Sequence, residues 1–208
     1  MINKIRIIVF LLIAAVSVPT MVLAESGKEM TELLGVKLGK AMTLSDVQKL
    51  LGSTRMIETG EAGEYRATVC YYIPRCSIKV AFWSDELGGY NHDVIGFTLT
   101  RTKTHEQSCR KLTNINCSAL GLANGIHMGM HLNDYKGILG DGIEFVEGYY
   151  QKAFVSQRPM TKKERSSISK ELSSQLPAGL IWDISVFVRG AFGADGLGIL
   201  EVSRTETN

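Results

Sequence analysis

The chain has 208 residues, of which 23 are lysine or arginine and 21 are aspartate or glutamate. Two of the basic residues, Lys4 and Arg6, and none of the acidic ones lie among the first 24, so the remainder carries 21 charges of each sign. This balance lacks the basic footprint that nucleic-acid-binding and anionic-membrane-binding proteins require, so we exclude both classes of partner.

The N-terminus has the pattern of a secretory signal. Lys4 and Arg6 accompany an apolar stretch, and residues 22–24 supply small side chains where a signal peptidase cleaves. We expect residues 1–24 to be a signal peptide that is cleaved after Ala24, which makes the protein periplasmic or secreted. No later segment approaches the length of a membrane span, so we expect none in the mature chain.

A short segment occurs twice. Residues 42–52 read MTLSDVQKLLG, and residues 130–140 read MHLNDYKGILG. The apolar residues recur at the spacing of one helical face, and the closing Gly52 and Gly140 are typical of a helix C-cap. The repeat predicts two short helices and one supersecondary unit that is used twice.

Strand patterns follow each predicted helix. In the first half they cover residues 66–73, 77–83 and 93–102, and in the second half residues 149–156, 180–189 and 197–204. Residues 66–73 are rich in β-branched and aromatic side chains, and residues 77–83 alternate cleanly, as expected of an antiparallel sheet with one face in water. In the second half, Thr161 and Glu164 form a capping-box signature that opens an inserted helix to about Leu176.

These elements predict an α+β fold of two tandem units, each with short helices packed on a three-stranded antiparallel sheet. The second unit carries the extra inserted helix. We expect the first unit at residues 25–103, a linker at 104–118 and the second unit at 119–208. Together they are long enough to share one core.

Four cysteines in an exported chain predict disulfides, because exported proteins meet an oxidising compartment. Three pairings are possible, and we favour the two local ones, Cys70 with Cys76 and Cys109 with Cys117, the latter inside the linker. A zinc site is the alternative, but the spacing matches no recognised zinc motif.

The tandem arrangement resembles the β-lactamase inhibitory protein family. A helix with a Met-Thr opening and a closing Leu-Gly precedes a three-stranded meander, and the single unit is similar to the small lipoproteins of the outer-membrane assembly machine. The first copy reads Ala41-Met42-Thr43 and the second Gly129-Met130-His131, so each departs from Gly-Met-Thr at one position. The resemblance implies a protein that lays a sheet face and hairpin tips over an enzyme.

The resemblance also implies that one tip enters the active site of the target. In this chain the corresponding tip is Ser84–His92, between the second and third predicted strands. Asp85, Glu86 and Tyr90 match the acidic and aromatic character of such a tip, so we assign them to partner binding.

Three more aromatic residues fall on the polar face of their predicted strands: Tyr72, Trp83 and Phe187. Large aromatic side chains on a solvated sheet face are typical of interface hot spots, so we also expect these three to bind a partner. The alternative is that the inserted helix or the other unit covers one or more of them.

The sequence shows no nucleophile elbow, no zinc-protease motif and no phosphate-binding loop, so we expect neither enzyme activity nor a cofactor. His127 and His131, with Met128 and Met130 between them, could bind copper. We favour a structural role instead, because Met130 aligns with Met42 and His131 with Thr43.

The sequence therefore predicts an exported protein-binding protein that inhibits or neutralises a partner, which we expect to be another exported protein and an enzyme. Such a protein is either an inhibitor or an immunity protein. An envelope assembly or scaffolding factor is the alternative, and a periplasmic metal-binding protein is the less favoured one.

Overall fold

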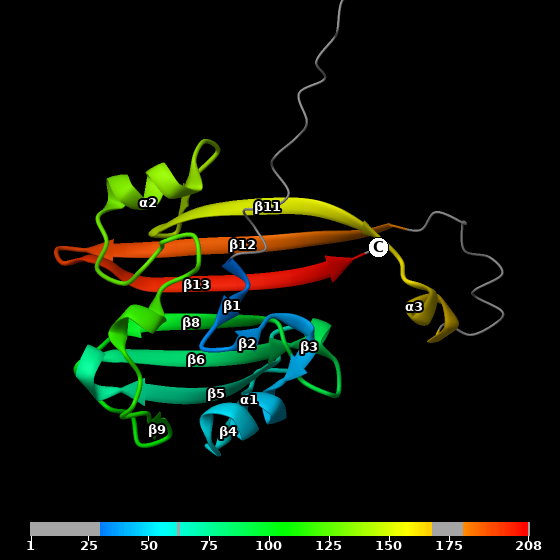
Figure 1. The fold of residues 1–208 in the computed structure, drawn as a ribbon, viewed down its shortest axis with the longest axis horizontal. Helices are drawn as coiled ribbons and strands as arrows, with labels where there is room; N and C mark the ends of the chain where they lie inside the picture. Colours follow the sequence, from blue (N-terminus) through cyan, green and yellow to red (C-terminus); the bar gives the residue numbers. More distant parts are fainter. Residues whose placement is uncertain (1–29, 62, 168–180, 208) are drawn as a thin grey trace, which may run out of the picture.

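The computed structural model describes residues 30–61, 63–167 and 181–207, so the predicted signal and most of the inserted helix lie outside the described residues. The described chain is built on one nine-stranded sheet (Figure 1). Its strands follow the order β10-β11-β12-β13-β8-β6-β5-β4 and are antiparallel, and β9 pairs with β5 in parallel.

The first half contributes four strands to this sheet: β4 (Met56–Thr59), β5 (Arg66–Ile73), β6 (Ile78–Asp85) and β8 (Gly96–Arg101). The predicted linker contributes β9 (Arg110–Lys111). The second half contributes four: β10 (Glu144–Val146), β11 (Tyr149–Pro159), β12 (Ile181–Gly193) and β13 (Gly196–Thr207). Smaller strands lie outside the sheet: β1 (Glu32–Leu33) pairs with β2 (Val36–Lys37), and β3 (Gly39–Thr43) pairs with β7 (Asp93–Val94).

The predicted α+β fold of helices packed on two three-stranded sheets is wrong, because the protein is mostly β. The last strands of the two halves, β8 and β13, pair with each other, so that Phe97 lies opposite Val202 and both halves form a single sheet. Each half also adds one unpredicted strand, which is β4 in the first half and β10 in the second. In the described ranges the α-helices have only eight, eight and six residues, too few to form a layer.

The two repeated segments do form helices, α1 (Leu44–Leu51) and α2 (Leu132–Leu139). The side chain of Thr43 accepts from the backbone N–H of Asp46, and the Asp46 carboxylate accepts from that of Thr43, which together cap α1. A hydrogen bond from Lys49, together with those from Thr43, lowers the pKa of Asp46 to about 2. Local hydrogen bonds therefore cap α1, and the backbone N–H of Leu44 adds a long-range bond to the carbonyl of His92 at 2.9 Å.

One face of the sheet, which we call the covered face, is packed under α1, α2, β1–β3 and the segment 120–130 (Figure 1). Its largest fully buried side chains include Tyr71 and Tyr135. The Tyr71 hydroxyl donates to the carbonyl of Gly52 at the end of α1, and the Tyr135 hydroxyl donates from α2 to the carbonyl of Tyr150 on β11. A buried tyrosine hydroxyl thus links each of α1 and α2 to the sheet.

The preferred local disulfides are also wrong: Cys70 is bonded to Cys109, and Cys76 to Cys117. The reason is the parallel pairing of β9 with β5, which places Arg110 beside Tyr71 and so brings the preceding cysteines together. The three-residue 3₁₀ helix η3 (Pro74–Cys76) then meets η5 (Cys117–Leu120). Both bonds fasten the predicted linker to the first half, and they are consistent with an oxidising, exported location.

The helix α3 (Lys162–Ser167) begins after Thr161 with the predicted capping box, and residues 168–180 lie outside the described ones. Glu164 also accepts two hydrogen bonds from Arg158, and these hold the pKa of its carboxyl well below the usual range. Arg158 reaches Glu206 at 2.6 Å, and Glu206 pairs with Arg204 as well. None of the helices in the described part of the chain has the length and apolarity to cross a membrane.

Gly96 in the central strand β8 provides a test of the packing. A Cβ atom there would lie 2.3 Å from the indole of Trp83 and 2.8 Å from the carbonyl oxygen of Val202 on β13. We expect Gly96→Ala to lower the free energy of unfolding by about 1–3 kcal/mol in urea denaturation. Gly137→Ala on α2, where a Cβ meets open space, is the matched control and should be neutral or stabilising. Equal effects of the two substitutions would contradict this packing.

The buried Tyr71 predicts a loss of stability in alkali. Burial raises the pKa of its hydroxyl to about 12, whereas an unfolded tyrosine titrates near about 10. The unfolded chain therefore loses its proton first, so the free energy of unfolding should fall as pH rises from about 10 to about 12. Burial raises the pKa of Tyr135 as well, which acts in the same direction.

Urea denaturation between pH 8 and pH 12 measures this fall. Tyr71→Phe should make it shallower, whereas Tyr90→Phe, at a fully exposed position, should leave it unchanged. A Tyr71→Phe slope equal to that of the parent would mean that Tyr71 ionises equally in both states.

Candidate functional site

Tyr72 and Trp83 lie on the sheet face opposite the main core, as the alternation predicts, but the expectation that they are exposed is wrong. Tyr72 is 7% exposed and Trp83 is 5% exposed. The ring of Tyr72 packs 5.3 Å from that of His105, beside the Cys70–Cys109 bond, so the linker covers it. We therefore remove both residues from the candidate contact surface.

Trp83 is buried by its neighbours in the sheet. Its indole fills the space that the missing side chain of Gly96 leaves, and the guanidinium of Arg66 lies 4.2 Å from the ring centroid. Neither contact could be inferred from the alternation of residues, because both depend on which strands are adjacent.

The predicted tip Ser84–His92 is held in a fixed shape by its own hydrogen bonds. The carboxylate of Asp85 accepts from the backbone N–H of Leu87 at 2.9 Å and so caps the 3₁₀ helix η4 (Glu86–Gly88). The backbone N–H of His92 donates to the carbonyl of Gly89 at 3.0 Å. The side chain of Glu86 accepts from the backbone N–H of Gly63, which ties the tip to the loop between β4 and β5.

Tyr90 stands out of this tip with its full surface in solvent, at 103% relative exposure. Beside it lies a hollow of about 520 Å³ that Asp85, Glu86, Tyr65 and His92 also line. The rings of Tyr65 and His92 are stacked with centroids 6.1 Å apart. The structure thus brings the three predicted tip residues together and adds the ring of Tyr65, which lies outside the tip in sequence, against His92 of the tip.

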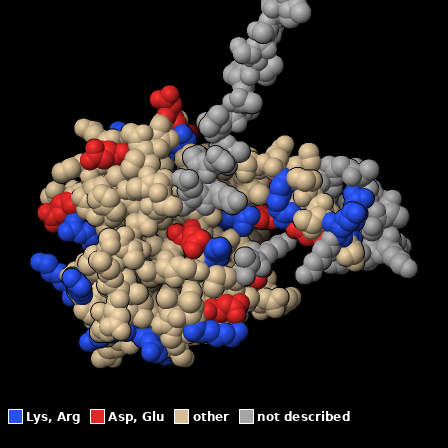
Figure 2. Space-filling view, viewed as in Figure 1, with Lys and Arg blue, Asp and Glu red and all other residues tan. Residues whose placement is uncertain are grey.

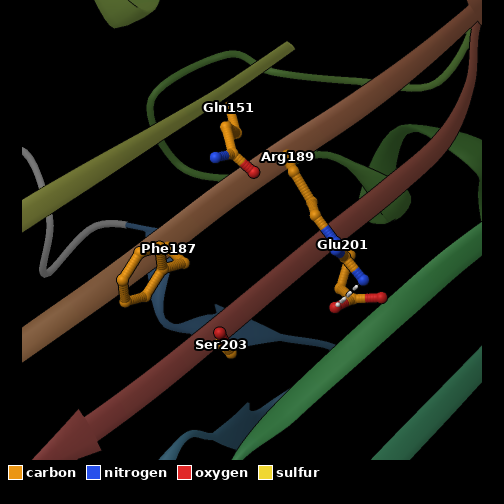
Figure 3. A pocket seen from close by; sticks show the side chains of 5 residues that line it. All are labelled: Gln151, Phe187, Arg189, Glu201 and Ser203. Carbon is orange, nitrogen blue, oxygen red and sulfur yellow. Dashed lines mark ion pairs between the residues drawn. The ribbon is translucent and has the colours of Figure 1, made fainter. Parts of the chain in front are cut away.

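Phe187 lies away from the tip, on the face of β11, β12 and β13 opposite the covered face, which we call the open face. It is 43% exposed. Figure 3 shows Phe187 beside Gln151, Arg189, Glu201 and Ser203. These five residues line a recess of about 170 Å³, too small for most ligand pockets but large enough for one side chain of a partner.

The recess is polar at one end. Arg189 pairs with Glu201 at 2.9 Å, and the hydroxyl of Thr98 donates to the same carboxylate at 3.3 Å. The alternation along β12 and β13 could have placed Phe187, Arg189, Glu201 and Ser203 on one face. Gln151 joins them only because β11 pairs with β12 in the register that sets Gln151 opposite Arg189.

His127 and His131, the less favoured metal ligands, are placed differently by the structure. His131 precedes α2 and makes no capping hydrogen bond through its side chain. His127 lines a groove together with Arg75 and Arg101, whose positive charges disfavour a bound cation. Among the described residues, the one cluster of three potential ligands is Cys70, Cys109 and Glu106, and its two sulfurs are joined in a disulfide.

Charges of both signs occur over the covered face that Figure 2 shows. No family model, curated protein or solved structure matches this chain. The resemblance to the β-lactamase inhibitory protein family therefore stays a prediction.

The tip provides a further test, which separates exposure from packing. Tyr90→Ala should change the free energy of unfolding by no more than about 0.5 kcal/mol, because the side chain is fully in water. Gly88→Ala should cost more than about 1 kcal/mol, because a Cβ there lies 1.9 Å from the buried Ser84 hydroxyl and 2.7 Å from the Asp93 carbonyl oxygen. Thermal denaturation of both variants measures this, and a destabilising Tyr90→Ala would mean that Tyr90 packs against the protein.

Proposed function

We propose that this chain is an exported protein that binds and inhibits a partner enzyme, with the tip Ser84–His92 entering the partner's active site. The observation that carries the proposal is Tyr90, a fully exposed aromatic side chain on a tip that internal hydrogen bonds hold in shape. A preformed tip loses little conformational freedom on binding, so its contacts are available as binding free energy.

The surroundings of Tyr90 support the same function. Asp85 and Glu86 place two carboxylates beside it, and the adjacent hollow gives a partner side chain a place to enter. Tyrosine is enriched among the residues that dominate protein interfaces, where such residues pack into desolvated pockets. The exposed Phe187 on the open face offers a second, separate contact.

Export is part of the proposal. The signal pattern at residues 1–24, with cleavage after Ala24, supports a location in the periplasm or outside the cell, and the two disulfides suit either location. The partner is then another exported protein. The proposal keeps the functional part of the family resemblance, a tip inserted into an active site.

The experiment has two steps. The tagged chain is first used to isolate binding proteins from native periplasm and culture supernatant, and the activity of any exported enzyme that is retained is then titrated with the purified chain. We expect activity to be lost at a 1:1 molar ratio. A retained enzyme that keeps full activity, or retention of outer-membrane assembly components alone, would overturn the inhibitor function.

Substitution at the tip tests the site itself. Tyr90→Ala should weaken inhibition by more than about 2 kcal/mol, which is roughly a 30-fold increase in the inhibition constant. Phe145→Ala is the matched control, because Phe145 is an exposed aromatic residue on the edge strand β10, away from the tip. If both variants inhibit as strongly as the parent, the tip does not enter the partner.

A further inference from the structure

The largest of the hollows described here lies at the disulfide-bonded end of the first half, away from both the tip and the open face. It is a groove of about 620 Å³ between the Cys76–Cys117 bond and the segment 127–129. This volume is within the range of small-molecule sites. We call it the basic groove, after the residues along its rim: Arg75, Arg101 and His127.

The charge of the groove has one sign. No aspartate or glutamate lines it, and within the described residues neither Arg75 nor Arg101 forms an ion pair. Arginine presents a planar fork of N–H donors that matches an oxyanion, and two guanidinium groups without a counterion attract one. The groove therefore favours an anion and disfavours a metal cation.

The floor of the groove is apolar. Ile78 and Leu120 are buried there, and Met128 packs against the main core beside them. An inorganic anion would leave this floor in contact with water, whereas an anion that carries a hydrocarbon body would cover it. The ligand that fits both parts is amphipathic, with one charged end.

The walls are fixed before any ligand arrives. The disulfide closes one side, and on the other the backbone N–H of Gly129 donates to the carbonyl of Leu197 at 2.9 Å. Arg101 is held at the same side, because its guanidinium donates to the carbonyl of Asp195 at 2.8 Å. A site whose walls are ordered in advance loses less entropy on binding.

His127 has a different role from the arginines. Its Nδ1 lies 3.2 Å from the carbonyl oxygen of Met128, and because a carbonyl only accepts, Nδ1 is the donor of this bond. In the neutral ring Nε2 is then an acceptor, which cannot hold an oxyanion. We assign the anion to Arg75 and Arg101.

We propose that the basic groove binds a small organic oxyanion, a carboxylate or a phosphate monoester, that carries an apolar chain. This site is separate from the tip, and the proposal does not rest on the inhibitor function. Hexanoate and hexyl phosphate are suitable probes, hexanol is the neutral counterpart, and sulfate is the anion without an apolar body.

Isothermal titration and amide chemical shifts of the purified chain test the proposal. We expect hexanoate or hexyl phosphate to bind with a Kd below about 1 mM, and hexanol and sulfate to bind at least about tenfold more weakly. The better of the two anions identifies the headgroup. Shifts should gather on Ser118, Leu120 and Gly129, which line the groove.

Arg75→Gln and Arg101→Gln should each weaken binding of the better anion about tenfold. Arg55→Gln is the matched control, because Arg55 is an exposed arginine that does not line the groove, and it should have no effect. Arg75 is exposed, so its substitution should leave the melting temperature unchanged. Arg75→Gln therefore keeps the test valid if Arg101→Gln disturbs the turn between β12 and β13, where Arg101 bonds Asp195. Three results would each overturn the proposal. They are hexanol binding as tightly as the anions, both anions binding with a Kd above about 1 mM, and equal losses in Arg55→Gln and Arg75→Gln.

Discussion

The pairing of β8 with β13 is the interaction on which the rest of the structure depends. Five residue pairs, from Ile199 opposite Thr100 to Ser203 opposite Gly96, join the last strand of each half. Without them each half would be a small meander with an open edge. With them the two apolar faces become one surface, which α1, α2 and the N-terminal strands cover together. The same pairing brings the carbonyl of Val202 close to Gly96, while the pairing of β6 with β8 sets Trp83 opposite it, so a methyl group at Gly96 would meet both.

The second constraint is the pair of disulfides, which acts on the segment between the halves. Because Cys109 and Cys117 are bonded to the first half, the connection lies along β5 and covers Tyr72. In the entropy model, each bond closes a loop of about 40 residues and stabilises the fold by about 4 kcal/mol. The bond between Cys76 and Cys117 also forms one wall of the basic groove. The disulfide that fastens the linker therefore also shapes the proposed ligand site.

Two surfaces are thus available for different tasks. The tip presents an exposed tyrosine with two carboxylates, which suits a protein surface that carries a cation and a pocket. The basic groove presents two arginines over an apolar floor, which suits a small amphipathic anion. Since the groove lies at the disulfide-bonded end and the tip at the end of β6 where Asp85 lies, the two can be tested by separate substitutions without mutual interference.

The sequence by itself determined what depends on near neighbours. The repeated segments become α1 and α2 because their apolar spacing and capping residues act within one or two turns. The strand predicted at 66–73 is recognised by its β-branched and aromatic residues, and the one at 77–83 by its alternation. The tip residues Asp85, Glu86 and Tyr90 lie together for the same reason, because a hairpin tip is local. Only the tertiary structure decided the merging of the halves, the disulfide connectivity, the burial of Tyr72 and Trp83, and the meeting of Arg75, Arg101 and His127. Each of these depends on which distant strands become adjacent, and alternation along a strand specifies its faces but not its neighbours.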